Sequence, residues 1–159
     1  TPKPDVIVVS SLKRSRQTAE ALKQYLGWPD IEIVVNEGFN EKKWGIMEGL
    51  THAQARDLLL QDEKLVRKYP YLATEEALKT VWEDPKFKAP GGGESLEEVA
   101  IRVRAAFNEL YNMYPNKNVL LVTHAGVLQT QELDFWKVSQ MTISQDESGN
   151  SVIKKKGLE

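Results

Sequence analysis

One histidine stands where a buried strand would give way to a turn, a position that can do chemistry. His124 follows the apolar run 119–122 and precedes Ala125 and Gly126. Ligands bind at the carboxyl edge of the sheet in open α/β folds, so an imidazole at such a strand end can contact a bound group. The chain of 159 residues has only two histidines, and this one has a position that predicts a functional role.

A second strand end carries hydroxyl and guanidinium groups suited to holding phosphate. The apolar run 6–9 leads into Ser10 and Ser11, and Arg14 follows in the first turn of a predicted helix over 12–26. A cation is disfavoured at a helix N-terminus. An anion lying between the two removes the conflict, because arginine binds phosphate through two parallel hydrogen bonds. The pattern therefore predicts a phosphate-binding strand end.

Two glycine-containing loops add a carboxylate and a hydroxyl. In the loop 36–50, Glu41 stands near Trp44, and partial burial against the indole would favour a protonated carboxyl that donates to a leaving oxygen. In the second loop, glycines 91–93 precede Ser95, whose hydroxyl suits either helix capping or a ligand. The second loop is not a nucleotide-binding Walker loop, because it lacks the Gly-Lys-Ser/Thr ending.

Short apolar strands alternate with amphipathic helices around these residues. We expect strands at 5–9, 31–35 and 118–123, helices at 12–26, 51–60, 63–83 (broken near Pro70), 95–114 and from 126, and a hairpin at 142–144 and 151–154. Strands that alternate with helices predict an α/β fold with a mostly parallel sheet covered on both faces. Since no linker divides the sequence, we expect a single domain over residues 1–159.

The composition excludes several classes of function. Lys plus Arg number 21 against 23 Asp plus Glu, so no basic field suggests nucleic acid as a partner. The absence of cysteine excludes disulfides, thiolate metal sites and a cysteine nucleophile. No apolar run approaches the roughly 18 residues of a membrane span. We expect a cytoplasmic protein without a membrane partner.

Four segments, 10–19, 40–51, 92–95 and 122–126, follow one another in an order that resembles the histidine phosphatase superfamily, in its phosphoglycerate mutase-like branch. The resemblance covers residues 5 to about 130. It implies a three-layer α/β/α sandwich and phosphoryl transfer through a phosphohistidine. It also implies that no metal or organic cofactor takes part.

The same resemblance implies roles for individual residues. Arg14 would clamp the phosphate, His124 would stabilise charge on the transferring group, and Glu41 would give a proton to the leaving oxygen. The substrate- or phosphate-binding positions would be Ser10, Ser11, Arg14, Glu48, Ser95 and Ala125. The form of segment 47–51 resembles the phosphatase members more than the glycolytic mutases. The expected ligand is a small phosphorylated metabolite or inorganic phosphate. The identity of the substrate would depend on residues 52–90 and on the absent first segment. The unranked candidate residues are Lys42, Lys43, Tyr69, Tyr71 and Trp82.

The sequence departs from the family at its hallmark, an Arg-His-Gly motif that supplies the nucleophilic histidine. The motif does not occur in these residues, and the other histidine, His52, falls in a predicted helix cap where we expect a surface residue. The chain begins with Thr1 where the family's second strand would be. We therefore expect an incomplete domain that lacks the first strand and helix, with little or no turnover by the chain alone.

Three explanations of this departure stay open. In the first, the chain is a fragment or trimmed isoform of an active phosphatase. In the second, it is a non-catalytic relative that binds phosphate and acts through a partner. In the third, a partner chain supplies the missing strand. Loss of a strand from inside the sheet would expose apolar edges and allow a homo-oligomer. A nucleotide-binding module is a weaker alternative, since no dinucleotide fingerprint is present.

Overall fold

The computed structural model describes residues 3–74, 76–130, 141–145 and 151–155. Its central sheet contains three parallel strands in the order β2-β1-β3, with bounds Val6–Val9 for β1, Glu32–Val35 for β2 and Val119–Val122 for β3. β1 lies in the middle, consists only of valine and isoleucine, and is buried along its whole length. Such a continuous apolar run is typical of a parallel strand covered on both faces.

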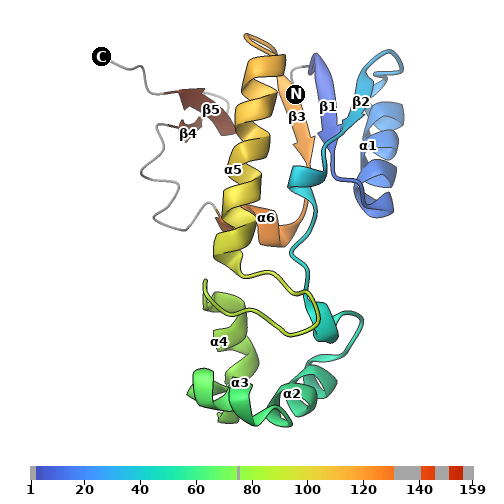
Figure 1. Ribbon diagram of the computed structural model, residues 1–159. Helices are drawn as coiled ribbons and strands as arrows, with labels where there is room; N and C mark the ends of the chain where they lie inside the picture. The colour runs from blue at the N-terminus through green and yellow to red at the C-terminus, as the bar shows by residue number, and fades with distance from the viewer. Residues whose placement is uncertain (1–2, 75, 131–140, 146–150, 156–159) are drawn as a thin grey trace.

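Helices cover both faces of the sheet, which confirms the predicted α/β/α architecture (Figure 1). α1 (Lys13–Leu26) packs on one face, and α5 (Leu96–Met113) and α6 (Ala125–Gln129) pack on the other. Alternate residues of β1 serve the two layers, because successive strand side chains point to opposite faces. Ile7 and Val9 join the cluster of Ala19 on α1, whereas Val8 joins the cluster of Val99 and Val103 on α5.

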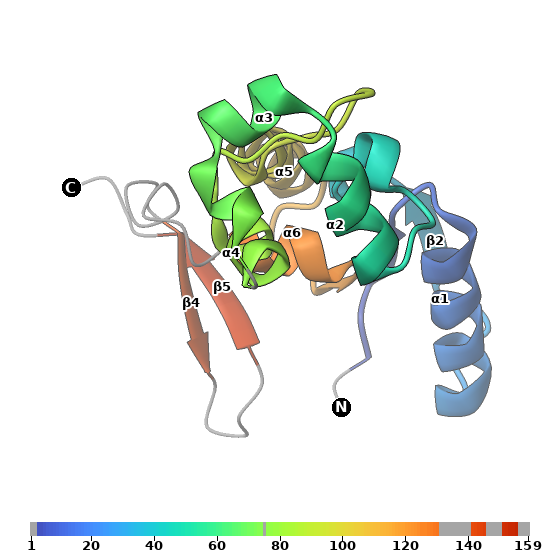
Figure 2. The same ribbon diagram turned by 90° about the horizontal axis from the view of Figure 1, so that it is seen from below.

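A helical lobe lies beyond the carboxyl ends of the strands (Figures 1 and 2). It consists of α2 (His52–Leu60), α3 (Glu63–Lys68), the 3-10 helix η3 (Pro70–Ala73) and α4 (Ala77–Glu83). The lobe has its own core, formed by Met47, Ala55, Leu59, Leu65, Tyr69, Leu72, Val81, Phe87 and Ala89. The lobe therefore faces the sheet edge at which the candidate chemistry was predicted.

Local chemistry fixes most of the helix ends that the sequence predicted. Thr51 and Ser95 both form complete capping boxes, and Gly27 ends α1 in a left-handed conformation with φ 67°. Two predictions need correction. Region 63–83 forms three helical pieces rather than one or two, and the loop 36–50 contains two 3-10 helices, η1 (Glu37–Phe39) and η2 (Gly45–Met47).

The remaining strands form the predicted hairpin. β4 (Met141–Gln145) pairs antiparallel with β5 (Ser151–Lys155) in a separate two-stranded sheet. The turn predicted between them falls at 146–150, outside the described residues. No helix in the described part of the chain is both long and apolar enough to cross a membrane.

The outer edge of β3 differs from the centre of the sheet. Within the described ranges, β3 pairs with β1 on one side and with no strand on the other. Each of its four apolar residues is only half-buried, whereas those of β1 are buried. The backbone groups along this edge are therefore left without a strand partner from the described chain.

Candidate functional site

The order of the strands creates a crevice at the ends of β1 and β3. The chain leaves β1 for β2 on one side and later returns to place β3 on the other side, and ligands bind at such reversals of strand order. Val9 pairs with Val122 in register, so the residues that follow these two strands meet. Ser10 Oγ lies 2.7 Å from His124 Nε2, which confirms that the two predicted strand ends adjoin.

The hydrogen bonds of His124 fix its protonation state. Arg14 Nε donates to His124 Nδ1 at 3.3 Å. Because an arginine nitrogen is always a donor, Nδ1 is unprotonated, and Nε2 carries the proton and donates to Ser10 Oγ. Burial of the ring, followed by the charge of Arg14, holds the pKa of His124 below its ordinary value of 6.5, while Glu41 opposes the shift. His124 is therefore a neutral imidazole near pH 7.

The two serines predicted to bind phosphate are engaged elsewhere. Ser10 is buried, and its Oγ lies 2.7 Å from both Ser15 Oγ and His124 Nε2, so this hydroxyl orients the imidazole ring. The amide and hydroxyl of Ser11 both donate to Asn40 Oδ1, at 2.8 and 3.0 Å. This contact ties the start of α1 to the loop that carries Glu41.

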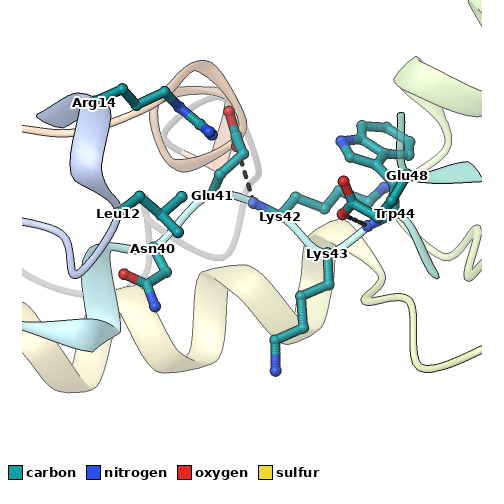
Figure 3. A pocket seen from close by; sticks show the side chains of 8 residues that line it. All are labelled: Leu12, Arg14, Asn40, Glu41, Lys42, Lys43, Trp44 and Glu48. Atoms are coloured by element: carbon teal, nitrogen blue, oxygen red, sulfur yellow. Dashed lines mark hydrogen bonds between the residues drawn. The ribbon is translucent and has the colours of Figure 1, made fainter. Parts of the chain in front are cut away.

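Glu41 projects toward the same space as Arg14 (Figure 3). Its Oε1 accepts hydrogen bonds from the Gly126 amide at 3.0 Å and from the Lys42 amide at 2.9 Å. A Cβ at position 126 would overlap this carboxylate oxygen, which explains why glycine suits that position. The indole expected against Glu41 instead carries another group: the Lys42 ammonium lies 4.3 Å from the centroid of the Trp44 ring.

These side chains border a cavity of about 420 Å³, a volume within the range of small-molecule sites. Its walls are formed by Leu12, Arg14, Asn40, Glu41, Lys42, Lys43, Trp44 and Glu48. Figure 3 shows Arg14 at one end, Trp44 and Glu48 at the other, and Glu41 between them. Glu48 Oε1 accepts from the Trp44 amide at 2.7 Å, so this predicted residue borders the cavity while it also orders the loop.

Sequence reasoning missed Arg102, which holds the Glu41 loop in place from α5. Its guanidinium donates to the carbonyls of Gly38, Asn40 and Glu41 at 2.9, 2.8 and 3.1 Å. It also pairs with both carboxylate oxygens of Glu94, at 2.8 and 3.0 Å. An arginine on a helix is ordinarily a solvated surface residue, so nothing in the local sequence signals this role.

Besides Ser10, Ser11 and His124, three further candidate residues lie outside the cavity wall. Ser95 Oγ accepts from the Glu98 amide at 3.1 Å and caps α5. Ala125 is the exposed first residue of α6, and His52 is exposed at the start of α2, its ring 6.2 Å from that of Trp82. Within the described ranges, no three His, Asp or Glu side chains gather to hold a metal ion. The structure thus brings together Arg14, Glu41 and His124.

The sequence also matches known proteins. A relative from Parvibaculum lavamentivorans, a 2,3-bisphosphoglycerate-dependent phosphoglycerate mutase, is 29% identical over 138 residues, which cover 86% of this chain and 59% of that protein. The uncharacterized phosphatase PhoE of Bacillus subtilis is 28% identical over 124 residues, 78% of this chain and 49% of that protein. The chain thus spans about half the length of the curated relatives it matches.

Solved structures share the fold. The native structure of a mycobacterial glucosyl-3-phosphoglycerate phosphatase superposes with a TM-score of 0.60 at 28% identity, covering 82% of this chain and 56% of that chain. YhfR of Bacillus stearothermophilus, 23% identical, superposes with a TM-score of 0.65 over 99% of this chain and 75% of that chain. The model of the histidine phosphatase superfamily (branch 1) matches residues 2–144. The chain, with its arginine, glutamate and histidine gathered at the strand ends, belongs to that superfamily.

Proposed function

We propose that the chain supplies the phosphate-binding and proton-donating half of a phosphomonoester hydrolase that works through a phosphohistidine and acts on a small phosphorylated metabolite. The observation that carries the proposal is the convergence of Arg14, His124 and Glu41 at adjoining strand ends. Phosphoryl transfer requires chiefly positioning and the neutralisation of charge on the equatorial oxygens. A cation, an imidazole and a carboxyl group serve these needs.

In the proposed reaction, each of the three side chains has a separate task. Arg14 binds two phosphate oxygens and releases His124 Nδ1 from its present contact. Nδ1 then takes up a proton and donates it to an anionic phosphate oxygen, while Nε2 keeps its hydrogen bond to Ser10. Glu41, in its protonated form, donates to the ester oxygen as the P–O bond breaks, and the leaving group departs as an alcohol. The phosphoryl group passes to the nitrogen of a nucleophilic histidine that residues 1–159 do not supply. Attack of water on this phosphohistidine then releases inorganic phosphate and regenerates the imidazole.

The relatives support this class of reaction. They include phosphoglycerate mutases, a phosphatase and the glucosyl-3-phosphoglycerate phosphatase, and the last, at 30% identity, has a solved complex with VO3. A vanadium oxyanion resembles phosphate during transfer. We therefore expect inorganic phosphate and vanadate to bind between Arg14 and His124.

We further propose that this chain alone has little or no turnover. The sequence contains no Arg-His-Gly motif to supply a nucleophilic imidazole, and His124 is held by Arg14 and Ser10 as a charge-stabilising group. The remaining histidine, His52, is exposed on α2. The same observation favours a second candidate function, a non-catalytic phosphate-binding protein that acts through a partner.

The binding half of the proposal is tested by calorimetric titration of the chain with inorganic phosphate and with vanadate. Arg14→Gln should weaken binding by about 10- to 100-fold, the value of a charge-assisted hydrogen bond at 1.5–3 kcal/mol. Arg16→Gln is the matched control, because this arginine lies exposed on the same helix. The proposal would be contradicted if the native chain bound neither phosphate nor vanadate, or if the two variants bound them with equal affinity.

Turnover and phosphohistidine formation separate the two candidates. Hydrolysis of p-nitrophenyl phosphate by the chain, retained in His52→Gln, would contradict the expected inactivity. The codons that precede Thr1 decide between the candidates: an Arg-His-Gly codon run after a strand-like apolar segment selects the hydrolase, and its absence selects the binding protein. Mass spectrometry of the protein expressed with those codons should then detect a phosphorylated histidine outside residues 1–159.

A further inference from the structure

Ser15 carries a buried hydroxyl that the proposed reaction does not use. It lies in the first turn of α1, only 3% of its surface is exposed, and Ala19 is the other buried residue of that helix. The face that a helix buries ordinarily carries apolar side chains, because a buried hydroxyl without hydrogen-bond partners is costly. The place of Ser15 is therefore explained by its partners and not by the packing of its helix.

The partners of Ser15 connect the start of α1 to the imidazole of His124. Ser15 Oγ lies 2.7 Å from Ser10 Oγ, which in turn lies 2.7 Å from His124 Nε2. Ser15 Oγ also donates to the Leu12 carbonyl at 2.9 Å, and the Leu12 amide donates to Ser10 Oγ at 3.2 Å. Because all three side chains are buried, this series of hydrogen bonds is shielded from water.

The contacts at its two ends fix the direction of every proton in the series. Since Arg14 donates to Nδ1, the neutral ring carries its proton on Nε2 and donates it to Ser10 Oγ. The Leu12 amide fills the second lone pair of Ser10 Oγ, so the hydroxyl proton of Ser10 goes to Ser15 Oγ. Ser15 is thus the acceptor that keeps the Ser10 proton away from Nε2.

We propose that Ser15 is a positioning residue for His124: through Ser10 it keeps the proton of the neutral ring on Nε2 and leaves Nδ1 free to take up a second proton when phosphate binds. The inference rests on the proposed function, in which Nδ1 donates to a phosphate oxygen. Without Ser15 Oγ, the Ser10 hydroxyl loses its acceptor and can turn its proton toward Nε2. The ring is then protonated on Nδ1 and donates to phosphate as a neutral group, whereas a charged ring makes the stronger hydrogen bond.

The surroundings of His124 show why a charged ring needs this support. Burial disfavours the imidazolium most, Arg14 on α1 and Arg102 on α5 disfavour it further, and Glu41 of the loop 36–50 favours it. Hydrogen bonds in a series polarise one another. A Ser10 hydroxyl that donates to Ser15 is therefore a better acceptor for Nε2–H, and it stabilises the ring when Nδ1 gains its proton.

The position of the ring proton is measured by ¹⁵N NMR of the unliganded chain with labelled histidine, at alkaline pH where the ring is neutral. His52→Gln identifies the signals of His124. Ser15→Ala should lower the ratio of the Nε2–H form to the Nδ1–H form about tenfold, the value of one neutral hydrogen bond. Thr18→Ala is the matched control, because it removes an exposed hydroxyl that donates to the Arg14 carbonyl of the same helix at 3.0 Å. An unchanged ratio in Ser15→Ala overturns the inference.

Calorimetry with inorganic phosphate measures the functional consequence. Ser15→Ala should weaken binding about 3- to 10-fold, because a neutral ring is the weaker donor to phosphate, and Thr18→Ala should leave the affinity unchanged. Full affinity in Ser15→Ala overturns the positioning role and preserves the proposed function. If the native chain binds no phosphate, the proposed function fails, and the NMR ratio still decides whether Ser15 fixes the ring proton.

A double-mutant cycle separates this role from a merely structural one. Ser15→Ala should have no further effect on phosphate affinity in a Ser10→Ala chain, because the connection to His124 is already broken there. If Ser15 only stabilised the start of α1 through its bond to the Leu12 carbonyl, the effects of the two substitutions would add. Additive effects therefore overturn the inference.

Discussion

At the scale of single residues, the state of His124 determines what the site does with an anion. Burial and Arg14 lower the pKa of this ring, and a phosphate dianion placed against it would reverse the effect, because a nearby negative charge favours the imidazolium. NMR titration of the ring should give a pKa below 6.5 in the unliganded chain and a higher value with phosphate. An unchanged value with saturating phosphate would mean that the anion binds elsewhere.

The same depressed pKa predicts a loss of stability on acidification. His124 is neutral in the folded chain and binds a proton at 6.5 when unfolded, so its contribution is complete above 6.5 and is lost as the pH falls through the lower folded value. Denaturant unfolding of the native chain and His124→Gln should converge as the pH falls over this window. Parallel pH profiles for the two proteins would contradict the assignment of a buried neutral ring.

Lys42 shows the same relation between charge and stability at a higher pH, because its pKa is also lowered. The folded chain disfavours the ammonium, so Lys42→Met should raise the free energy of unfolding at pH 7 by up to about 3 kcal/mol, since the pKa falls from 10.5 to about 8 and one pKa unit is worth 1.36 kcal/mol. For the native chain, this contribution should recover between about 8 and 10.5 as the amine deprotonates. Urea unfolding at pH 7 and pH 10 measures both effects, and a less stable Lys42→Met at pH 7 would contradict them.

The sequence predicted the positions of Arg14 and His124 but not the burial of Lys42, because their surroundings arise in different ways. Arg14 and His124 each follow an apolar strand directly, so the local pattern alone places them at the sheet edge. The Lys42 ammonium lies over Trp44, and this indole packs in turn against Trp82 on α4, about forty positions further along the chain. No local pattern encodes such packing, and the two lysines at 42 and 43 look alike in sequence although only Lys42 is buried.

At the scale of elements, the pair of Arg102 and Glu94 connects α5 to the loop that carries Glu41. Burial opposes ionisation of Glu94, but hydrogen bonds from Arg102 and from the Lys43 amide hold the pKa of this carboxyl below its ordinary value. Both side chains are largely shielded, with 24% and 17% of their surfaces exposed. The pair therefore acts as a support for three loop carbonyls as well as a salt bridge.

Arg102→Met should lower the free energy of unfolding by about 1–3 kcal/mol, because it leaves partly buried carbonyls and a carboxylate without their donor. The control is Arg67→Met, whose pair with Glu63 is 3.8 Å long and more than four-fifths exposed on both sides, and which should cost less than about 0.5 kcal/mol. Thermal unfolding measures both. Phosphate affinity should fall in Arg102→Met and stay unchanged in Arg67→Met. Equal losses of stability and of phosphate affinity in the two variants would contradict the proposed role of Arg102 in holding the Glu41 loop.

The bounds of the elements were predictable where a local signal marks a helix end. Capping boxes at Thr51 and Ser95, and Gly27 after α1, gave correct helix ends because the side chains and the backbone satisfy each other within four residues. The pieces around Pro70 were harder to predict, since η3 is too short for a helical period to be visible. The loop 36–50 gained η1 because the Asn36 side chain accepts from the Gly38 amide.

At the scale of the whole molecule, the strand order β2-β1-β3 determines where the site lies and leaves the outer edge of β3 without a strand partner in the described residues. The predicted layers and the parallel sheet are confirmed, whereas the single domain over 1–159 stays a prediction. The half-buried edge of β3, unpaired by any strand of the described residues, predicts association of the purified chain. Sedimentation velocity across a wide range of protein concentrations should detect growing species, and a monomer at every concentration would contradict the expectation.

The contact between the Lys42 ammonium and the Trp44 indole has an optical consequence. A charge on an indole face alters the emission of that ring, so any ligand that draws the ammonium away, or any loss of its proton, changes the fluorescence of the protein. Trp82 touches the same ring, so Trp82→Phe would isolate the signal of Trp44 from its neighbour. The fluorescence of Trp44 can therefore report ligand binding in the cavity, and ligands can be screened in solution without a label.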